Sequence, residues 1–411
     1  MSKAPGVPLS TYGWSCGSST PEKPLTFQQK QQIMSQLGKI SASLSNLRSN
    51  QLGSLVLSDK GYEVRKCLYP GFVWFGRDKF DDNYIQRGPF NDVQMFYRAL
   101  LSAFFAHIKE LPLVNHLFHA PVPNEQAYED FHDYKVATHR WNGYAMLGSK
   151  IEGSKNRLDY ILAGIALLVL VPLLAEKDNQ FMCSGFPLCH PDLSLGNIFI
   201  DEQLSISCII DWGFASFIPQ SMFFICPGLP QSRYGTNPNL EPPFAQGFIE
   251  GHGFDAQRDL DFSNSSIFWK FKHLVNFDFL EDYSHLSDLV SSLTGQAVHP
   301  LLETLKHREK FTQELRALAE ETPCEEELRE MKDDEERFFT SAGPEDLTIA
   351  RHLTVIAELN PRFVVSDQLW NWISFYLDER ELYMFPASEA LAATQSKSVW
   401  RLCRHRNASW A

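Results

Sequence analysis

Residues 190–211, HPDLSLGNIFIDEQLSISCIID, form the stretch that decides the fold. Two runs in it, 198–200 and 206–210, are rich in β-branched residues, and a polar segment joins them, which predicts a β-hairpin. If 198–200 pairs antiparallel with 208–210, Asn197 and Asp211 lie across from each other at the open end of the hairpin. Asp192 lies in the loop just before the hairpin. The sequence therefore predicts that three polar side chains gather at one end of a hairpin.

These side chains fit a phosphoryl-transfer site. Asn197 and Asp211 offer an amide oxygen and a carboxylate, which are hard ligands that suit Mg2+, and phosphate oxygens complete the shell of that ion. Asp192 is then placed to orient an acceptor hydroxyl and to take its proton. We expect His190 to order the loop through hydrogen bonds. The plain alternative is a polar loop before an ordinary hairpin, but the HxDxxxxN spacing, the hairpin and the final Asp-Trp pair together favour the site.

The wider segment, LCHPDLSLGNIFIDEQLSISCIIDWGFAS at residues 188–216, resembles the catalytic segment of the aminoglycoside phosphotransferase and choline kinase-like family, particularly its fungal branch. RGPF at 87–90, APVP at 120–123 and NRLDY at 156–160 also resemble that branch. The resemblance covers roughly residues 1–250 of the chain. It implies an ATP- and Mg2+-dependent phosphotransferase that acts on a hydroxyl of a small molecule. The residues that it implies are the catalytic base Asp192, the loop histidine His190, and the metal ligands Asn197 and Asp211.

The family's fold also has a small N-terminal lobe that binds the nucleotide. The first residues, MSKAPGVPLSTYGW, resemble the hinge that follows this lobe, so we expect the lobe to be absent from this chain. The segment 148–155, GSKIEGSK, imitates a phosphate-binding loop, but Lys155 follows a serine rather than the second glycine. We therefore expect a solvated loop there. A hairpin predicted at 54–64, with Lys66 after it, is too small to form the lobe and is interpreted as a surface hairpin.

Two functions follow from these expectations. The first is phosphoryl transfer, with a fuller gene product or a partner completing the site. The second is a non-catalytic, kinase-like binding or interaction module, or a truncated gene product. The nucleotide-binding residues and the small-molecule acceptor are unknown at this point.

Composition narrows the class of protein. The chain has 411 residues and a net charge of -13, which argues against a nucleic-acid partner because phosphate contacts need clustered Lys and Arg. The apolar run 161–175 is shorter than the roughly 20 residues of a membrane span and contains Pro172, so we expect a buried core helix and no membrane partner. The eight cysteines form no CxxC pair, and the N-terminus has no apolar signal segment. These features predict reduced thiols and a cytoplasmic location.

Helical patterns fill most of the remaining chain. Thr26 and Gln29 form a predicted capping box for a helix that reaches Leu47, and further helices are expected at 90–107 and 156–170. We expect a long ordered loop at 219–244, helices from 248 onward, and a solvated helix face over the acidic residues 320–337. The predicted fold class is α+β, mainly α: a protein-kinase-like large lobe with a catalytic-loop β-hairpin. The predicted domains are a hinge-like remnant at 1–25, the kinase-like lobe at 26–247 and a helical C-terminal extension at 248–411.

Overall fold

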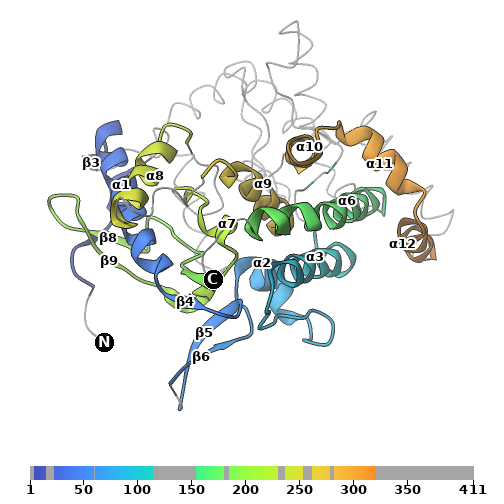
Figure 1. The fold of residues 1–411 in the computed structure, drawn as a ribbon, viewed down its shortest axis with the longest axis horizontal. Helices are drawn as coiled ribbons and strands as arrows, with labels where there is room; N and C mark the ends of the chain where they lie inside the picture. The colour runs from blue at the N-terminus through green and yellow to red at the C-terminus, as the bar shows by residue number, and fades with distance from the viewer. Residues whose placement is uncertain are drawn as a thin grey trace, which may run out of the picture. The chain divides into compact units, whose positions relative to one another are not determined.

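The computed structural model describes a mixed α+β fold that is mainly helical and has antiparallel sheets (Figure 1). The residues described are 4–14, 23–59, 61–113, 116, 118, 154–179, 185–229, 237–252, 262–277 and 282–320. The chain divides into two compact units. The first contains residues 1–111 and 161–306, and the second contains residues 112–160 and 307–411. The domain boundaries predicted after residues 25 and 247 rest on the family resemblance. They do not coincide with the limits of these two units, and they stay a prediction.

The predicted hairpin is confirmed and lies in a three-stranded sheet. Its strands are β8 (Ile198–Ile200) and β9 (Ile206–Ile209), and β1 (Val7–Pro8) pairs with β8 on the other side. The register differs by one residue from the prediction, because Ile198 pairs with Ile209 rather than with Ile210. The physical reason is the turn, where the Asp201 carboxylate accepts hydrogen bonds from the amides of residues 203 and 205 and sets the pairing. A bulge between residues 199 and 200 then adds a single residue to β9.

A five-stranded antiparallel sheet has the strand order β4-β7-β10-β5-β6. Its strands are β4 (Arg48–Ser49), β7 (Phe186–Cys189), β10 (Ser216–Phe217), β5 (Gly53–Ser58) and β6 (Gly61–Arg65). The hairpin predicted at 54–64 is present as β5 and β6. It is not an isolated surface hairpin, because β10 pairs with the base of β5 while the hairpin tip is exposed. The pairing of β10 with β5 could not be predicted from the local sequence, because β10 is only two residues long.

Helix α1 (Phe27–Ser45) begins at the predicted capping box of Thr26 and Gln29. It packs closely against α8 (Glu241–His252), where a Cβ added to Gly247 would lie 1.9 Å from the carbonyl oxygen of Ser35. Only glycine allows this approach of the two backbones.

The loop predicted at 219–244 was wrong in part, because the short helix α7 (Gln220–Phe223) and the start of α8 lie within it. The prolines at 242 and 243 lie in the first turn of α8, where proline is tolerated.

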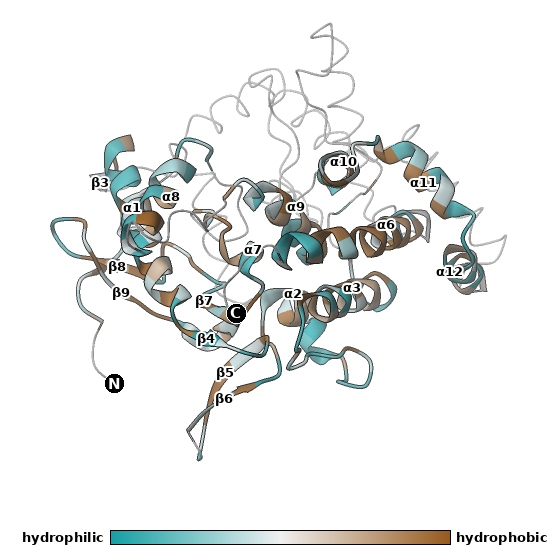
Figure 2. Cartoon of the chain, in the orientation of Figure 1, coloured by the Kyte–Doolittle hydropathy of each residue, from teal (hydrophilic) through white to brown (hydrophobic). Residues whose placement is uncertain are grey.

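Helices α3 (Val93–Glu110) and α6 (Ser154–Asn179) correspond to the predicted helices at 90–107 and 156–170. Helix α6 continues through Pro172 and includes Ser154 and Lys155, so these two residues are helical rather than part of a solvated loop. Within the described residues, α6 is the one helix long and apolar enough to cross a membrane (Figure 2). Of its apolar window, 67% is buried. This burial agrees with the core helix that the sequence predicts.

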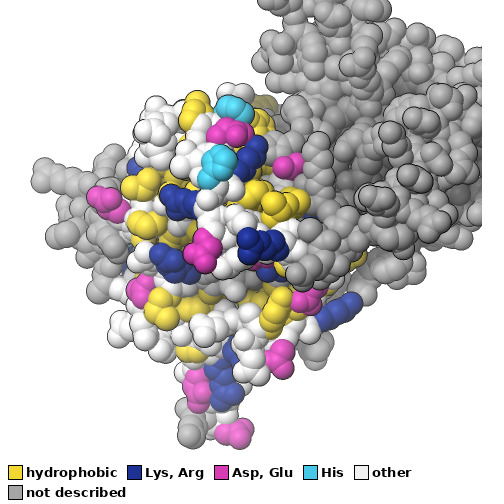
Figure 3. All heavy atoms as spheres, turned by 90° about the vertical axis from the view of Figure 1, so that its right-hand side faces the viewer, with side chains coloured by type: hydrophobic (Ala, Val, Ile, Leu, Met, Phe, Trp, Pro, Cys, Tyr) yellow, Lys and Arg dark blue, Asp and Glu magenta, His cyan; other side chains and the backbone are white. Residues whose placement is uncertain are grey.

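The described residues after 248 are mainly helical. The first unit contains α9 (Ser265–Asn276), α10 (Asp282–Thr294) and α11 (Val298–Lys306), and the second unit contains α12 (Glu309–Glu320). The predicted acidic face lies outside the described residues except for Glu320. Cys67, Cys189, Cys208 and Cys226 are in no disulfide bond. On the face drawn in Figure 3, acidic and basic side chains of the described residues are interspersed.

Candidate functional site

Two loops of the first unit are held at both ends by paired strands. The loop 190–197 leaves β7 and enters β8, while the loop 210–215 leaves β9 and enters β10. Strand β7 pairs with β10, through Cys189 and Ser216, and β8 pairs with β9, through Ile198 and Ile209. Since each loop starts and ends beside the other, the topology brings together the segments that contain the four predicted site residues.

Hydrogen bonds connect these two loops directly. The His190 Nε2 atom lies 2.9 Å from the carbonyl oxygen of Ile210, and the Ile210 amide donates to the carbonyl of Asn197 at 3.0 Å. Within the first loop, the side-chain amide of Asn197 donates to the Asp192 carbonyl at 2.9 Å. The expected role of His190 in ordering the loop is consistent with its bond to Ile210. The second loop is thereby fixed one residue before Asp211.

The backbone of Asp211 has a left-handed conformation, with φ 65° and ψ 58°. Aspartate is one of the few residue types that enters this region with any frequency. The carbonyls of the two preceding residues are both held, because the Trp212 indole N–H donates to Ile209 at 2.8 Å and His190 holds Ile210. The Trp212 ring also contacts the His190 ring edge-on, with centroids 4.7 Å apart. These contacts support the unusual turn at Asp211, whose side chain is exposed.

Two oxygen ligands remain for a cation. The Asn197 amide uses its nitrogen for the Asp192 carbonyl, and its Oδ1 makes no hydrogen bond within the described part of the chain. The Asp211 carboxylate, in the same part, makes no hydrogen bond or ion pair. Among the described residues no group of three or more His, Cys, Asp or Glu is arranged to hold a metal. The oxygens of Asn197 and Asp211 are of the kind that Mg2+ prefers, whereas zinc sites in proteins are built mainly from nitrogen and sulfur ligands.

The predicted site residues come together in part. Asp192 is half-buried and accepts a hydrogen bond from Asn197 through its backbone carbonyl, and His190 is buried at the start of the loop. Asn197 and Asp211 do not lie directly opposite each other, because the register places Ile210 across from Asn197. Sequence reasoning missed Trp212 as a support for the Asp211 turn. Its position directly after the aspartate was the only signal.

The N-terminal segment also supports the loop. Strand β1 pairs with β8, and the Ser10 amide donates to the carbonyl of Leu195 at 2.9 Å. On the opposite side, the Gln36 side chain of α1 bonds the Leu204 carbonyl and the Ile206 amide, at 2.9 and 2.8 Å. The hairpin is thus held from two sides by segments distant in sequence.

Comparisons of the chain with protein-family models, with curated proteins and with solved structures gave no match. What can be said of its function therefore follows from its residues and their geometry.

Proposed function

We propose that this chain carries the catalytic loop of a Mg2+-dependent phosphotransferase similar to the aminoglycoside phosphotransferase and choline kinase-like family. The donor is a nucleoside triphosphate, and the acceptor is a hydroxyl of a small molecule. The observation that carries the proposal is the joint restraint of the loops 190–197 and 210–215 by two strand pairs. This restraint brings an acidic loop residue and two oxygen ligands into one region, as phosphoryl transfer needs.

The donor set fits Mg2+. Asn197 would contribute Oδ1, because its amide nitrogen is occupied by the Asp192 carbonyl. Asp211 would contribute its carboxylate, which has no protein partner in the described part of the chain. When bound, Mg2+ neutralises phosphate charge and orients the phosphate oxygens. Such a site needs only these two protein ligands.

The chain's own residues supply the remaining steps. Asp192 accepts the proton of the acceptor hydroxyl and orients that hydroxyl toward the phosphoryl group. Asn197 holds the backbone of Asp192, so ligand placement and base placement depend on one side chain. His190 and Trp212 keep the turn at Asp211 in place through the Ile210 and Ile209 carbonyls.

Calorimetric titration of ATP into the full chain, with and without Mg2+, tests the proposal. We expect heat of binding that requires Mg2+ and that disappears in Asp211→Ala. Asp192→Ala should keep this binding, because it removes the base and neither ligand. Asp59→Ala, which removes a carboxylate at the exposed tip of the β5–β6 hairpin, is the control and should bind as the wild type does.

The outcomes separate the two functions considered. Heat that is absent at millimolar ATP, or equal in wild type and Asp211→Ala, rejects the phosphotransferase proposal. The chain would then be better described as a kinase-like binding or interaction module. Where binding is found, phosphate transfer to a panel of small hydroxylated compounds identifies the acceptor.

A further inference from the structure

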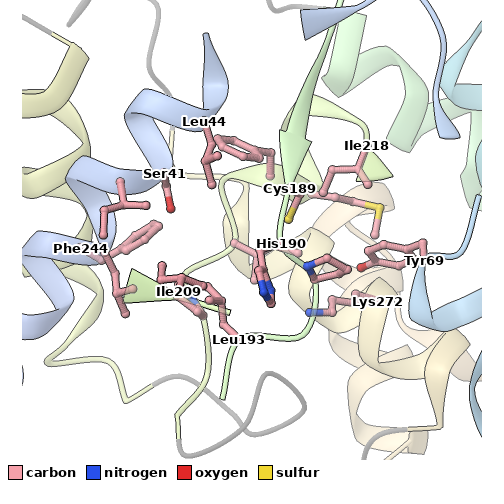
Figure 4. Close-up of a pocket in the computed structure, with 17 residues that line it drawn as sticks. Ser41, Leu44, Tyr69, Cys189, His190, Leu193, Ile209, Ile218, Phe244 and Lys272 are labelled. Atoms are coloured by element: carbon pink, nitrogen blue, oxygen red, sulfur yellow. The ribbon is translucent and has the colours of Figure 1, made fainter. Parts of the chain in front are cut away.

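One end of the five-stranded sheet is covered by a helix, and the other end is an edge strand. Near the first end, α1 packs against β7, and Cys189 of β7 lines a cavity together with Leu44 of α1 (Figure 4). At the other end, β6 pairs with β5 and has no second neighbour among the described strands. The hairpin of these two strands extends beyond the rest of the sheet (Figure 1). An edge strand of this kind is able to pair with a strand of another chain.

The hydrogen-bonding groups that β6 leaves at this edge belong to Tyr62 and Val64. The Leu55 amide donates to the Ala215 carbonyl at 3.2 Å, so the backbone of Leu55 faces β10 rather than β6. In an antiparallel pair, two residues that lie opposite each other either exchange hydrogen bonds or both turn their polar groups outward. Val64 is the partner of Leu55, so its N–H and C=O point away from β5. Those of Tyr62, two residues earlier, point the same way.

Charge selects the register in which a second copy of β6 pairs with the first. A two-fold antiparallel pair of strands must be centred on one residue, so that outward groups meet outward groups. A centre on Glu63 or on Arg65 sets two like charges opposite each other, which is unfavourable. A centre on Tyr62 places Glu63 opposite Gly61, where it has no charged partner. A centre on Val64 instead places Glu63 of each copy opposite Arg65 of the other.

The charged side chains are available for this pairing. Within one copy the Arg65 guanidinium contacts the Glu63 carboxylate at 3.0 Å, and the two side chains remain 56% and 33% exposed. In the register centred on Val64, each guanidinium lies between two carboxylates, one from its own copy and one from the other. The four charges therefore alternate in sign across the pair.

Apolar side chains meet on the opposite face of the pair. Leu55, Leu57, Tyr62 and Val64 share one face of the hairpin, because side chains alternate along each strand. Leu55 and Val64 pack against a small buried cluster, whereas Leu57 is 68% exposed and Tyr62 is 75% exposed. In the register centred on Val64, the two Val64 side chains are neighbours, and Tyr62 of each copy lies diagonally beside Val64 of the other. The pairing therefore also covers exposed apolar surface.

We infer that β6 is a self-association surface, on which two copies of the chain pair antiparallel with Val64 at the two-fold axis. A second copy fits better than an unrelated strand, because opposite charges at Glu63 and Arg65 make β6 complementary to itself. The pairing joins the two five-stranded sheets into one. It involves no residue of the loops 190–197 and 210–215, so it does not depend on the proposed function.

Charge reversal tests the pairing. Glu63→Arg and Arg65→Glu should each weaken self-association at least about tenfold in sedimentation equilibrium, because two facing charge pairs become repulsive. An equimolar mixture of the two variants should restore association to the wild-type level, since each reversed charge then faces an opposite one. Glu202→Arg, at an exposed residue in the turn of the β8–β9 hairpin, is the control and should associate as the wild type does.

Cysteine variants test the register. Val64→Cys should form a disulfide between two copies under mild oxidation, because Cα atoms that face each other across the axis lie within the roughly 4.4–6.8 Å that a disulfide needs. Tyr62→Cys should not, because the two positions are four residues apart along the paired strands, which is roughly 13–14 Å. Non-reducing electrophoresis measures both variants, and the wild type under the same oxidation accounts for the native thiols.

Four results would overturn the inference. A wild type that stays monomeric at every concentration would reject self-association. Association that Glu63→Arg and Arg65→Glu leave unchanged would place the contact away from β6. A mixture of the two variants that stays monomeric would reject the facing charge pairs. A disulfide that forms more readily in Tyr62→Cys than in Val64→Cys would reject the register.

Discussion

The side chain of Asn197 donates a hydrogen bond to the backbone carbonyl of Asp192 across 2.9 Å. This bond connects the end of the loop, where β8 begins, to the residue proposed as the base. It also fixes the orientation of the Asn197 amide, so that the nitrogen faces the loop and the oxygen is left for another ligand. One side chain thereby links the geometry of the loop to the proposed cation site.

Asn197→Asp separates these two roles. Aspartate keeps an oxygen ligand but cannot donate to the Asp192 carbonyl, so we expect a loss of about 1 kcal/mol in the free energy of unfolding. Chemical denaturation measures it. Asn237→Asp is the matched control, because the Asn237 side chain accepts from the Asn239 amide and aspartate accepts equally well. An equal loss in both variants would contradict this role of the Asn197 nitrogen.

Ser54→Ala should destabilise the five-stranded sheet. Ser54 lies in the buried base of β5. Its hydroxyl accepts a hydrogen bond from the Leu68 amide at 2.7 Å and shares a second one, also 2.7 Å long, with the hydroxyl of Ser216 in β10. Alanine removes the acceptor of the Leu68 amide and the bond to Ser216, whose hydroxyl keeps its bond to the Phe214 carbonyl, and the loss should cost about 1–3 kcal/mol of unfolding free energy. Leu57→Ala at the exposed tip should change it by less than about 0.5 kcal/mol. Similar values for both variants in urea denaturation would show that β5 is not anchored at Ser54.

Gly247→Ala should disrupt the packing of α1 against α8. The added methyl group would lie 1.9 Å from the Ser35 carbonyl oxygen, so the two helices must move apart. Overpacking of this kind costs about 1–3 kcal/mol, although alanine has the better helix propensity. Gln246→Ala, on the exposed face of the same helix, is the control. A stability of Gly247→Ala equal to or above that of Gln246→Ala in thermal unfolding would contradict the close approach.

Asp178 should make stability depend on pH. Burial raises the pKa of this carboxyl from 3.8 to about 6, although hydrogen bonds from Tyr97 and Ser221 oppose the shift. A raised folded-state pKa gives a contribution that is fully present below pH 3.8 and is lost as pH rises through about 6. The wild type should therefore lose up to about 3 kcal/mol of unfolding free energy over this range relative to Asp178→Asn. Parallel pH profiles of the two proteins in chemical denaturation would contradict the buried titration.

Local signals predicted the parts of the fold that depend on neighbouring residues. The capping box at Thr26 fixes the start of α1, and the alternation of β-rich runs with a polar turn fixes the hairpin β8–β9. The register could not be predicted, because the bulge after Phe199 depends on the geometry of the turn. The start of α8 was not predicted, because Pro242 and Pro243 suggested a loop. A first helical turn tolerates proline.

The residues of the candidate site could be proposed from the sequence. The strand pairs and side-chain contacts that hold its two loops could not. The spacing of Asp192, Asn197 and Asp211 can be read along the chain. The pairing of β7 with β10 cannot, because it joins Cys189 to Ser216 through a strand of two residues. The left-handed turn at Asp211 depends on contacts from His190 and Trp212 that form only in the folded chain.

The most direct measurement of the central claim is electron paramagnetic resonance with Mn2+ in place of Mg2+, in the presence of ATP. We expect one nucleotide-dependent Mn2+ site in the wild type. We expect loss of that site in Asp211→Ala, and retention in Asp192→Ala and in the exposed control Asp59→Ala. Mn2+ binding that is the same in wild type and Asp211→Ala, or binding that does not respond to ATP, would contradict the claim that Asn197 and Asp211 hold a cation for phosphoryl transfer.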